Sequence, residues 1–128
     1  MLNLQGVHHT GLTVSNLDDA IAWYGEHLGL KTLEARWRVE HAGMEVAYLC
    51  DGHGHRVELF EREDASKLPP VGRDHLAFTV ADIEAEVKKL EDAGVEITVR
   101  PSHVDAASLT YAFFADPDGN KLELVQPD

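Results

Sequence analysis

Two histidines and two glutamates recur at matching positions of this chain. His9 and His75 are separated by 66 residues, and Glu58 and Glu123 are separated by 65. Imidazole nitrogens and carboxylate oxygens are both ligands of first-row divalent metals. Two of each, gathered in one place, would bind an ion and leave two positions free for water or a substrate. The first question is therefore whether the chain brings the four residues together.

The spacing of these residues follows an internal repeat that covers most of the chain. The segment VHHTGLTV at 7–14 returns as DHLAFTV at 74–80, and the turn sequence DGHG at 51–54 returns as DPDG at 116–119. The offset changes from 66 to 65 between these two matches, and a one-residue deletion in a loop explains the change, because loops tolerate deletions. The chain therefore contains two copies of one motif.

The repeat favours a metal site over a coincidence of ionisable residues. A lone histidine is usually an ordinary surface or core residue, and a lone glutamate on a strand usually lies on the solvated face. Here four positions form two symmetry-matched ionisable pairs, and all four are ligand types. The sequence therefore predicts one divalent ion, with Zn, Ni, Co, Mn and Fe all possible.

Each copy of the motif predicts the same order of elements, β-α-β-β-β. In the first copy we expect a helix that begins after Asn16 as N-cap and ends at Gly29, with Leu17, Ile21, Tyr24 and Leu28 as its apolar stripe. Its strands are expected at 5–14, 31–39, 44–50 and 55–61, with turns at 40–43 and 51–54. In the second copy we expect strands at 74–80, 95–100, 109–115 and 120–126, a helix from Asp82 to Ala93, a loop at 101–108 and a turn at 116–119.

These elements predict an α+β fold in a single domain, 1–128. It would consist of paired βαβββ modules at 5–61 and 74–126, joined by a linker at 62–73, which form an open, curled mixed-sheet barrel with the helices outside. Residues two apart on a strand share a face. His9 and His75 on the first strands, and Glu58 and Glu123 on the last strands, would then line the concave side. His8 would point to the opposite face, in a structural or solvent role.

Composition limits the classes of function. With 44% hydrophobic and 27% charged residues, the 128-residue chain fits a globular protein. Its formal net charge of −12 disfavours nucleic acid and anionic membranes as partners. Cys50 is the only cysteine, which excludes an intrachain disulfide. The start of the chain has no signal-peptide pattern, so we expect a cytoplasmic protein.

The motifs resemble those of the vicinal oxygen chelate superfamily. The resemblance rests on the segment beginning HTGLTV at His9, on VEL around Glu58, on HLAFTV at His75 and on DPDGNKLEL through Glu123. That superfamily includes glyoxalase I, bleomycin-resistance proteins, fosfomycin-resistance transferases, methylmalonyl-CoA epimerase and extradiol dioxygenases. The resemblance implies the paired βαβββ fold and a metal held by His9, Glu58, His75 and Glu123.

The ligand set separates the branches of this superfamily. Extradiol dioxygenases and fosfomycin transferases are similar to this chain at the two histidines and the last glutamate, but do not generally use a carboxylate at the position of Glu58. Glyoxalase I and the epimerase use a ligand there, and bleomycin-resistance proteins bind without metal. The resemblance therefore favours a glyoxalase-like lyase or isomerase. An Fe(II) extradiol-type dioxygenase and a non-enzymatic drug- or metabolite-binding protein are the alternatives.

The lyase and isomerase branch implies specific roles. A small substrate with vicinal oxygens chelates the metal, which stabilises the enediolate or enolate formed by proton removal. Similarity to glyoxalase I makes Glu123 the base and Glu58 its symmetry mate, and similarity to the epimerase adds Glu45 as a candidate. The loop at 101–108 and the segment 71–74 depart from the loops of glyoxalase I and the epimerase, so neither glutathione nor CoA is implied. A homodimer is expected from the same relatives.

Other residues have a choice of roles. Four aromatic residues could line the pocket or fill the core: Trp37, Tyr48, Tyr111 and Phe113. Three arginines could hold a substrate carboxylate or lie on the surface: Arg36, Arg38 and Arg100.

Overall fold

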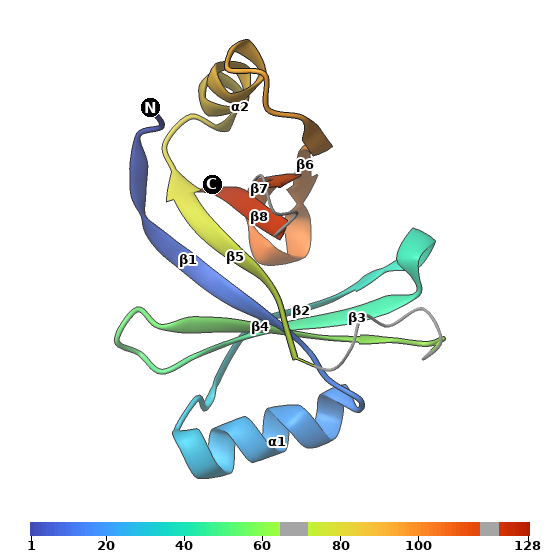
Figure 1. Cartoon of the computed structure of the whole chain (residues 1–128). Coiled ribbons are helices and arrows are strands. Elements are labelled where there is room, and N and C mark those ends of the chain that lie inside the picture. Colours follow the sequence, from blue (N-terminus) through green and yellow to red (C-terminus); the bar gives the residue numbers. More distant parts are fainter. Residues whose placement is uncertain (65–71, 116–120) are drawn as a thin grey trace. The chain divides into compact units, whose positions relative to one another are not determined.

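The computed structural model describes residues 1–64, 72–115 and 121–128, and their elements follow the predicted order (Figure 1). The first copy contains β1 (Leu4–Thr13), α1 (Leu17–Leu28), β2 (Thr32–Val39), β3 (Met44–Cys50) and β4 (Arg56–Arg62). The second contains β5 (Gly72–Val80), α2 (Ile83–Asp92), β6 (Ile97–Val104), β7 (Leu109–Ala115) and β8 (Lys121–Pro127). The predicted turn at 116–119 and most of the linker, 65–71, lie outside the described residues.

The chain divides into two compact units. The first module is His9–Asp74, and the second module is His75–Asp128 together with Met1–His8. Strand order is β2-β3-β4-β1 in the first and β5-β8-β7-β6 in the second. In each module the first and last strands of the copy pair in parallel and the remaining pairs are antiparallel. The predicted α+β fold class with paired βαβββ modules is confirmed.

Helix α1 begins and ends where the sequence predicts. The Oδ1 of Asn16 accepts a hydrogen bond from the backbone N–H of Asp19 at 2.9 Å, and Gly29 closes the helix with φ of 72°. The predicted apolar stripe is wrong at its last position, because Leu28 is 56% exposed. Leu30 packs against the core in its place. A residue just past a glycine C-cap commonly folds back in this way.

Each helix covers one face of its own module's sheet. In the first module, Leu17 of α1 packs on Ala47, Leu49 and Leu59 of the central strands. In the second, α2 is capped by Asp82, and its buried residues join a core from β5, β7 and β8. That core consists of Val80, Ile83, Val87, Leu90, Ala112, Phe114 and Leu124. The opposite face of each sheet is left to the predicted site residues.

The loop predicted at 101–108 is largely wrong. Strand β6 runs through Pro101 to Val104, and only Asp105–Ala107 forms a short 3₁₀ turn. Pro101 interrupted the predicted strand because proline lacks a backbone donor. However, β6 is an edge strand of its module, and its register with β7 shifts between Val99 and Ser102. An edge position at an irregularity is where a strand tolerates proline.

The predicted hairpin turn at 51–54 is ordered by a carboxylate. Asp51 accepts hydrogen bonds from the backbone N–H groups of His53 at 2.7 Å and His55 at 3.3 Å. These bonds, with the His55 ring, lower the pKa of Asp51 to about 2.

Within the described residues, neither helix has the length and apolar character needed to cross a membrane.

His103, near the end of β6, contacts Asp105 and Asp128. These contacts predict that the free energy of unfolding depends on pH. Its Nδ1 lies 2.9 Å from Asp105 and its Nε2 lies 2.9 Å from Asp128. The hydrogen bond to Asp128 is the largest cause of a raised His103 pKa, and Asp105 adds to it. Because the folded pKa is raised, the stabilisation is complete below the unfolded value of about 6.5 and is lost as pH rises through the folded pKa.

We therefore expect His103→Gln to lower the free energy of unfolding more at about pH 5.5 than at about pH 8.5. Urea denaturation at both pH values measures this difference, and NMR titration of the ring gives the pKa directly. His53→Gln is the control, since His53 is also exposed and its backbone makes the bond to Asp51. Equal destabilisation by His103→Gln at the two pH values would show that the contacts of His103 with Asp105 and Asp128 do not depend on a charged imidazole.

Candidate functional site

The first module brings His9 together with Glu58. The two residues lie on the adjacent parallel strands β1 and β4, where Glu58 pairs in register with Gly11, two residues after His9. The His9 Nε2 is 3.7 Å from the Glu58 Oε2. The His9 side chain is fully buried and the Glu58 side chain is 12% exposed. Gly11 has no side chain to separate them, so the donor atoms face one another.

The second module repeats this arrangement with His75 and Glu123. On β5 and β8, Glu123 pairs in register with Ala77, again two residues after the histidine. The His75 Nε2 is 2.9 Å from the Glu123 Oε2, and both side chains are buried. The repeat that was inferred from spacing therefore extends to the contact between the side chains. His75 and Glu123 lie in one module and His9 and Glu58 in the other.

An aromatic ring backs each pair. Tyr48 lies directly across from Glu58 on β3, with its ring centroid 5.0 Å from that of His9. Phe113 lies across from Glu123 on β7, with its centroid 5.4 Å from that of His75. These two aromatic residues therefore line the site face of their modules, and they fix the imidazole orientations by packing. Trp37 and Tyr111 extend the two clusters as their edge-to-face neighbours.

A cation lies over each of these rings, a feature that sequence reasoning missed. The Arg56 guanidinium is 5.7 Å from the centroid of Tyr48, and the Lys121 ammonium is 4.5 Å from that of Phe113. Arg56 and Lys121 are 65 residues apart, as are Glu58 and Glu123, so the repeat offset would have found them. Glu34 holds Arg56 in two hydrogen bonds of 2.6 and 2.7 Å, which raise the pKa of Arg56.

The donor set in each module fits a divalent metal. Two ligands about 2.1 Å from one ion are about 3.0 Å apart at a right angle and about 3.4 Å apart at the tetrahedral angle. The His75–Glu123 separation of 2.9 Å and the His9–Glu58 separation of 3.7 Å lie close to these values. Burial removes competing water, and nitrogen with carboxylate oxygen suits Zn, Ni, Co, Mn or Fe. Each module can therefore supply two ligands.

Glu45, the epimerase-type candidate, lies on the wrong face of β3. Because side chains alternate along a strand, Glu45 shares its face of β3 with Ala47 and Leu49, which pack under α1. Tyr48, by contrast, faces His9. The carboxylate of Glu45 is ion-paired with Arg38 at 3.3 Å. The structure therefore places Glu45 away from the His9–Glu58 pair.

The three candidate arginines are already paired with carboxylates. Arg36 binds Asp18, Arg38 binds Glu40, Glu45 and Glu63, and Arg100 binds Glu91. The histidines outside the pairs also differ from one another: His8 is buried at 7% exposure, whereas His53 and His55 are exposed. None of these observations favours a direct role for Arg36, Arg38 or Arg100.

Comparisons with known proteins agree with this architecture. The family model described as Glyoxalase/Bleomycin resistance protein/Dioxygenase superfamily matches residues 6–124. The chain is 41% identical over 125 residues to the glutathione transferase FosA of Serratia marcescens, covering 94% of this chain and 80% of that protein. It is 32% identical over 124 residues to a probable lactoylglutathione lyase of Vibrio cholerae, covering 92% and 88%.

A solved structure gives the same result at the level of the fold. The methylmalonyl-CoA epimerase of Mycobacterium tuberculosis is similar to this chain with a TM-score of 0.87 and 28% sequence identity. The similarity covers 100% of this chain and 91% of the epimerase. A transferase, a lyase and an epimerase are thus all similar to the chain over most of its length.

Proposed function

The chain belongs to the glyoxalase/bleomycin resistance protein/dioxygenase superfamily, and we propose that within it this protein is a divalent-metal-dependent lyase or isomerase of the glyoxalase type. The observation that carries the proposal is the histidine–glutamate pair, present once in each module at 3.7 and 2.9 Å, in which both histidines and Glu123 are buried and the Glu58 side chain is 12% exposed. Burial of such polar groups is costly unless they have a partner, and a bound metal would provide one.

We propose His9, Glu58, His75 and Glu123 as the ligands of one metal ion. His9, Glu58 and His75 each offer a donor atom that metals bind, and Glu123 lies 2.9 Å from His75. Zn, Ni, Co, Mn and Fe all suit a set of two imidazoles and two carboxylates. When bound, the metal supplies a Lewis acid that stabilises negative charge on two vicinal oxygens of a small substrate.

The protein's own groups would move the proton. Glu123 accepts it from the substrate carbon and returns it to a neighbouring carbon or to the other face. Glu123 is 3% exposed and faces the apolar ring of Phe113, so solvent does not compete for this proton. Glu58 is its counterpart in the first module, and its 12% exposed side chain is more open to water. Tyr48 and Phe113 hold the imidazoles in place.

The second candidate is a metal-dependent glutathione transfer reaction. The 41% identity to a glutathione transferase, the highest among the relatives described above, favours it. Glu58 argues against it, because the resemblance to fosfomycin transferases implies that they do not generally use a carboxylate at this position. Reaction of the substrate without exchange of its carbon-bound hydrogen would support the transferase. The Fe(II) dioxygenase alternative predicts oxygen consumption with catechols.

Assembly and location are part of the proposal. We expect a small-molecule substrate with vicinal oxygens as the binding partner, a homodimer as the oligomeric state and the cytoplasm as the compartment. The net charge of −12 supports the expectation that neither nucleic acid nor a membrane surface is a partner.

The test uses chelator-treated protein that is reloaded with each of the five metals. In D2O, lactoylglutathione and methylmalonyl-CoA are the probes, and mass spectrometry measures deuterium at the carbon beside the thioester carbonyl. We expect metal-dependent incorporation into at least one probe. Stoichiometric metal with oxygen consumption on catechol and no deuterium would support the dioxygenase instead. Absence of stoichiometric metal binding would overturn the proposal.

A further inference from the structure

Strand β4 carries a second cation beyond the site residues. Arg56, Glu58, Phe60 and Arg62 alternate along β4 and share its site face. Arg62 lies four residues beyond Glu58, about 13 Å along the strand. Its side chain is half-buried, at the end of the face that carries the His9–Glu58 pair. An extended substrate that reached Glu58 would reach Arg62 at its other end.

Two buried polar atoms at this end of the face have no hydrogen-bond partner within the described part of the chain. They are the Nε of Arg62 and the Oγ1 of Thr13. Thr13 is 2% exposed and pairs in register with Phe60 on the same face, which places it diagonally next to Arg62. Buried polar groups are nearly always hydrogen-bonded, so two neighbouring exceptions require an explanation. A bound group with acceptor oxygens provides one.

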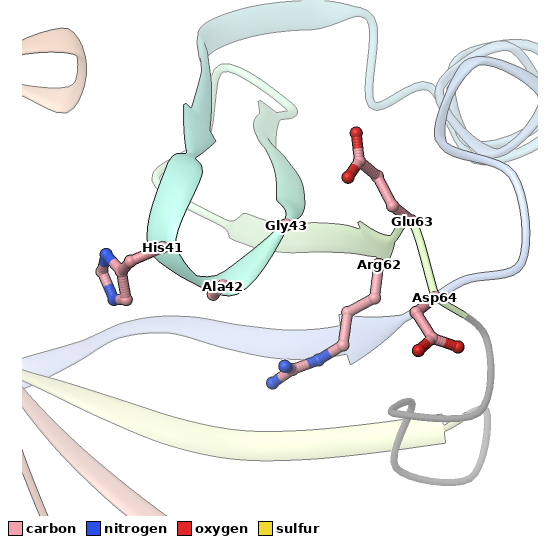
Figure 2. Close-up of a pocket in the computed structure, with 6 residues that line it drawn as sticks. All are labelled: His41, Ala42, Gly43, Arg62, Glu63 and Asp64. Carbon is pink, nitrogen blue, oxygen red and sulfur yellow. The ribbon is translucent and has the colours of Figure 1, made fainter.

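A cavity opens beside Arg62. It has a volume of about 160 Å³ and is lined by His41, Ala42, Gly43, Arg62, Glu63 and Asp64 (Figure 2). Sites for whole ligands are usually about 300–1,000 Å³, so this cavity has room for one functional group only. Figure 2 shows Glu63 pointing away from Arg62, on the other side of the strand end. Arg38 holds the Glu63 carboxylate at 2.6 Å, which leaves Arg62 without it.

We propose that Arg62 and Thr13 bind the terminal anionic group, a carboxylate or phosphate, of the substrate. The guanidinium presents Nε–H and Nη–H as a planar pair of donors that matches two oxygens of such a group. The threonine hydroxyl donates one further hydrogen bond to an oxygen of the same group. The link to a substrate rests on the proposed function, whereas the binding of the anion does not. In a chain of net charge −12, a half-buried guanidinium whose Nε has no hydrogen-bond partner among the described residues favours an anion.

Titration of metal-free protein tests the anion site directly. Inorganic phosphate and acetate are the two probes, and the NMR signal of the Arg62 Nε–H reports binding. We expect saturable shifts with one or both anions, and the ratio of the two affinities identifies phosphate or carboxylate as the preferred group. Arg62→Gln should weaken binding by about tenfold or more. Thr13→Val should weaken it by a smaller factor, since it removes one neutral donor.

Two further variants separate this site from general effects of charge. Arg100→Gln removes the same charge from an exposed arginine that is already paired with Glu91, and it should leave anion affinity unchanged. Asp64 lies on the same side as Arg62 in Figure 2, so Asp64→Asn should tighten binding by removing a nearby negative charge. Circular dichroism checks that each variant folds.

The outcomes distinguish this inference from the proposed function. If Arg62→Gln binds both anions as tightly as Arg100→Gln does, the inference is overturned. His75→Ala should retain anion binding, and Arg62→Gln should retain metal binding. Loss of metal binding alone would therefore remove the proposed function and leave the anion site standing. The absence of saturable binding in the wild-type protein would remove the anion site alone.

Discussion

Replacing His75 with alanine is expected to lower the affinity for a divalent metal by more than about 100-fold. Substitutions of groups that only support a metal ligand cost about 10- to 100-fold, and His75 is proposed as a ligand itself. Its imidazole is buried and lies 2.9 Å from Glu123, so alanine would also leave that carboxylate buried beside a cavity. Chelator competition measures the affinity, and elemental analysis of the purified protein gives the metal content per chain.

The repeat supplies the comparison for this result. His9→Ala should have a similar effect, because His9 occupies the corresponding position beside Glu58 at 3.7 Å. His53→Ala is the control. It removes an exposed imidazole, and the hydrogen bond from His53 to Asp51 is kept because its backbone N–H is the donor. Unchanged metal content in both His9→Ala and His75→Ala would refute the metal site. Loss in His53→Ala as well would point to non-specific binding by histidines.

Glu123→Gln is expected to slow deuterium exchange into the substrate by about 10²- to 10⁴-fold, the usual contribution of a general base. The amide keeps the size of the side chain, but it cannot accept the substrate proton. The rate must be measured at saturating metal, because the same residue is a proposed ligand. Mass spectrometry of the quenched substrate then reports proton transfer rather than metal loss.

Glu58→Gln is the matched variant in the first module. If Glu123 is the base, Glu58→Gln at saturating metal should retain most of the exchange that Glu123→Gln loses. Equal losses in the two variants would mean that the two carboxylates share the proton transfer. A larger loss in Glu58→Gln would reverse the assignment, and full activity in both would rule out proton transfer by either residue.

The features that depend on local periodicity were predictable from the sequence. The repeat offset identified His75 from His9, and strand alternation chose His9 over His8 for the site face. The N-cap Asn16 and the C-cap Gly29 were read from residue types with known preferences, and both are present. The turn at 51–54 was likewise signalled by aspartate and glycine. These signals are short-range, so they survive without knowledge of the packing.

What the sequence could not provide depends on tertiary context. Leu28 fits the helical stripe but is exposed, and only the packed structure shows that Leu30 replaces it. Pro101 reads as a strand breaker until its strand is known to be an edge. The sequence also does not show that the Thr13 Oγ1 and the Arg62 Nε lack hydrogen-bond partners among residues 1–64, 72–115 and 121–128, because this depends on the surroundings of each atom.

The division between modules falls between His8 and His9 and again between Asp74 and His75, two positions 66 residues apart. Met1–His8 therefore complete the second module: the Asn3 N–H donates to Glu86 of α2 at 3.3 Å, and Leu2 packs against the apolar core there. A break within 65–71 would separate the C-terminal fragment from this segment. Because both parts belong to one chain, the second module obtains this segment intramolecularly, independent of protein concentration.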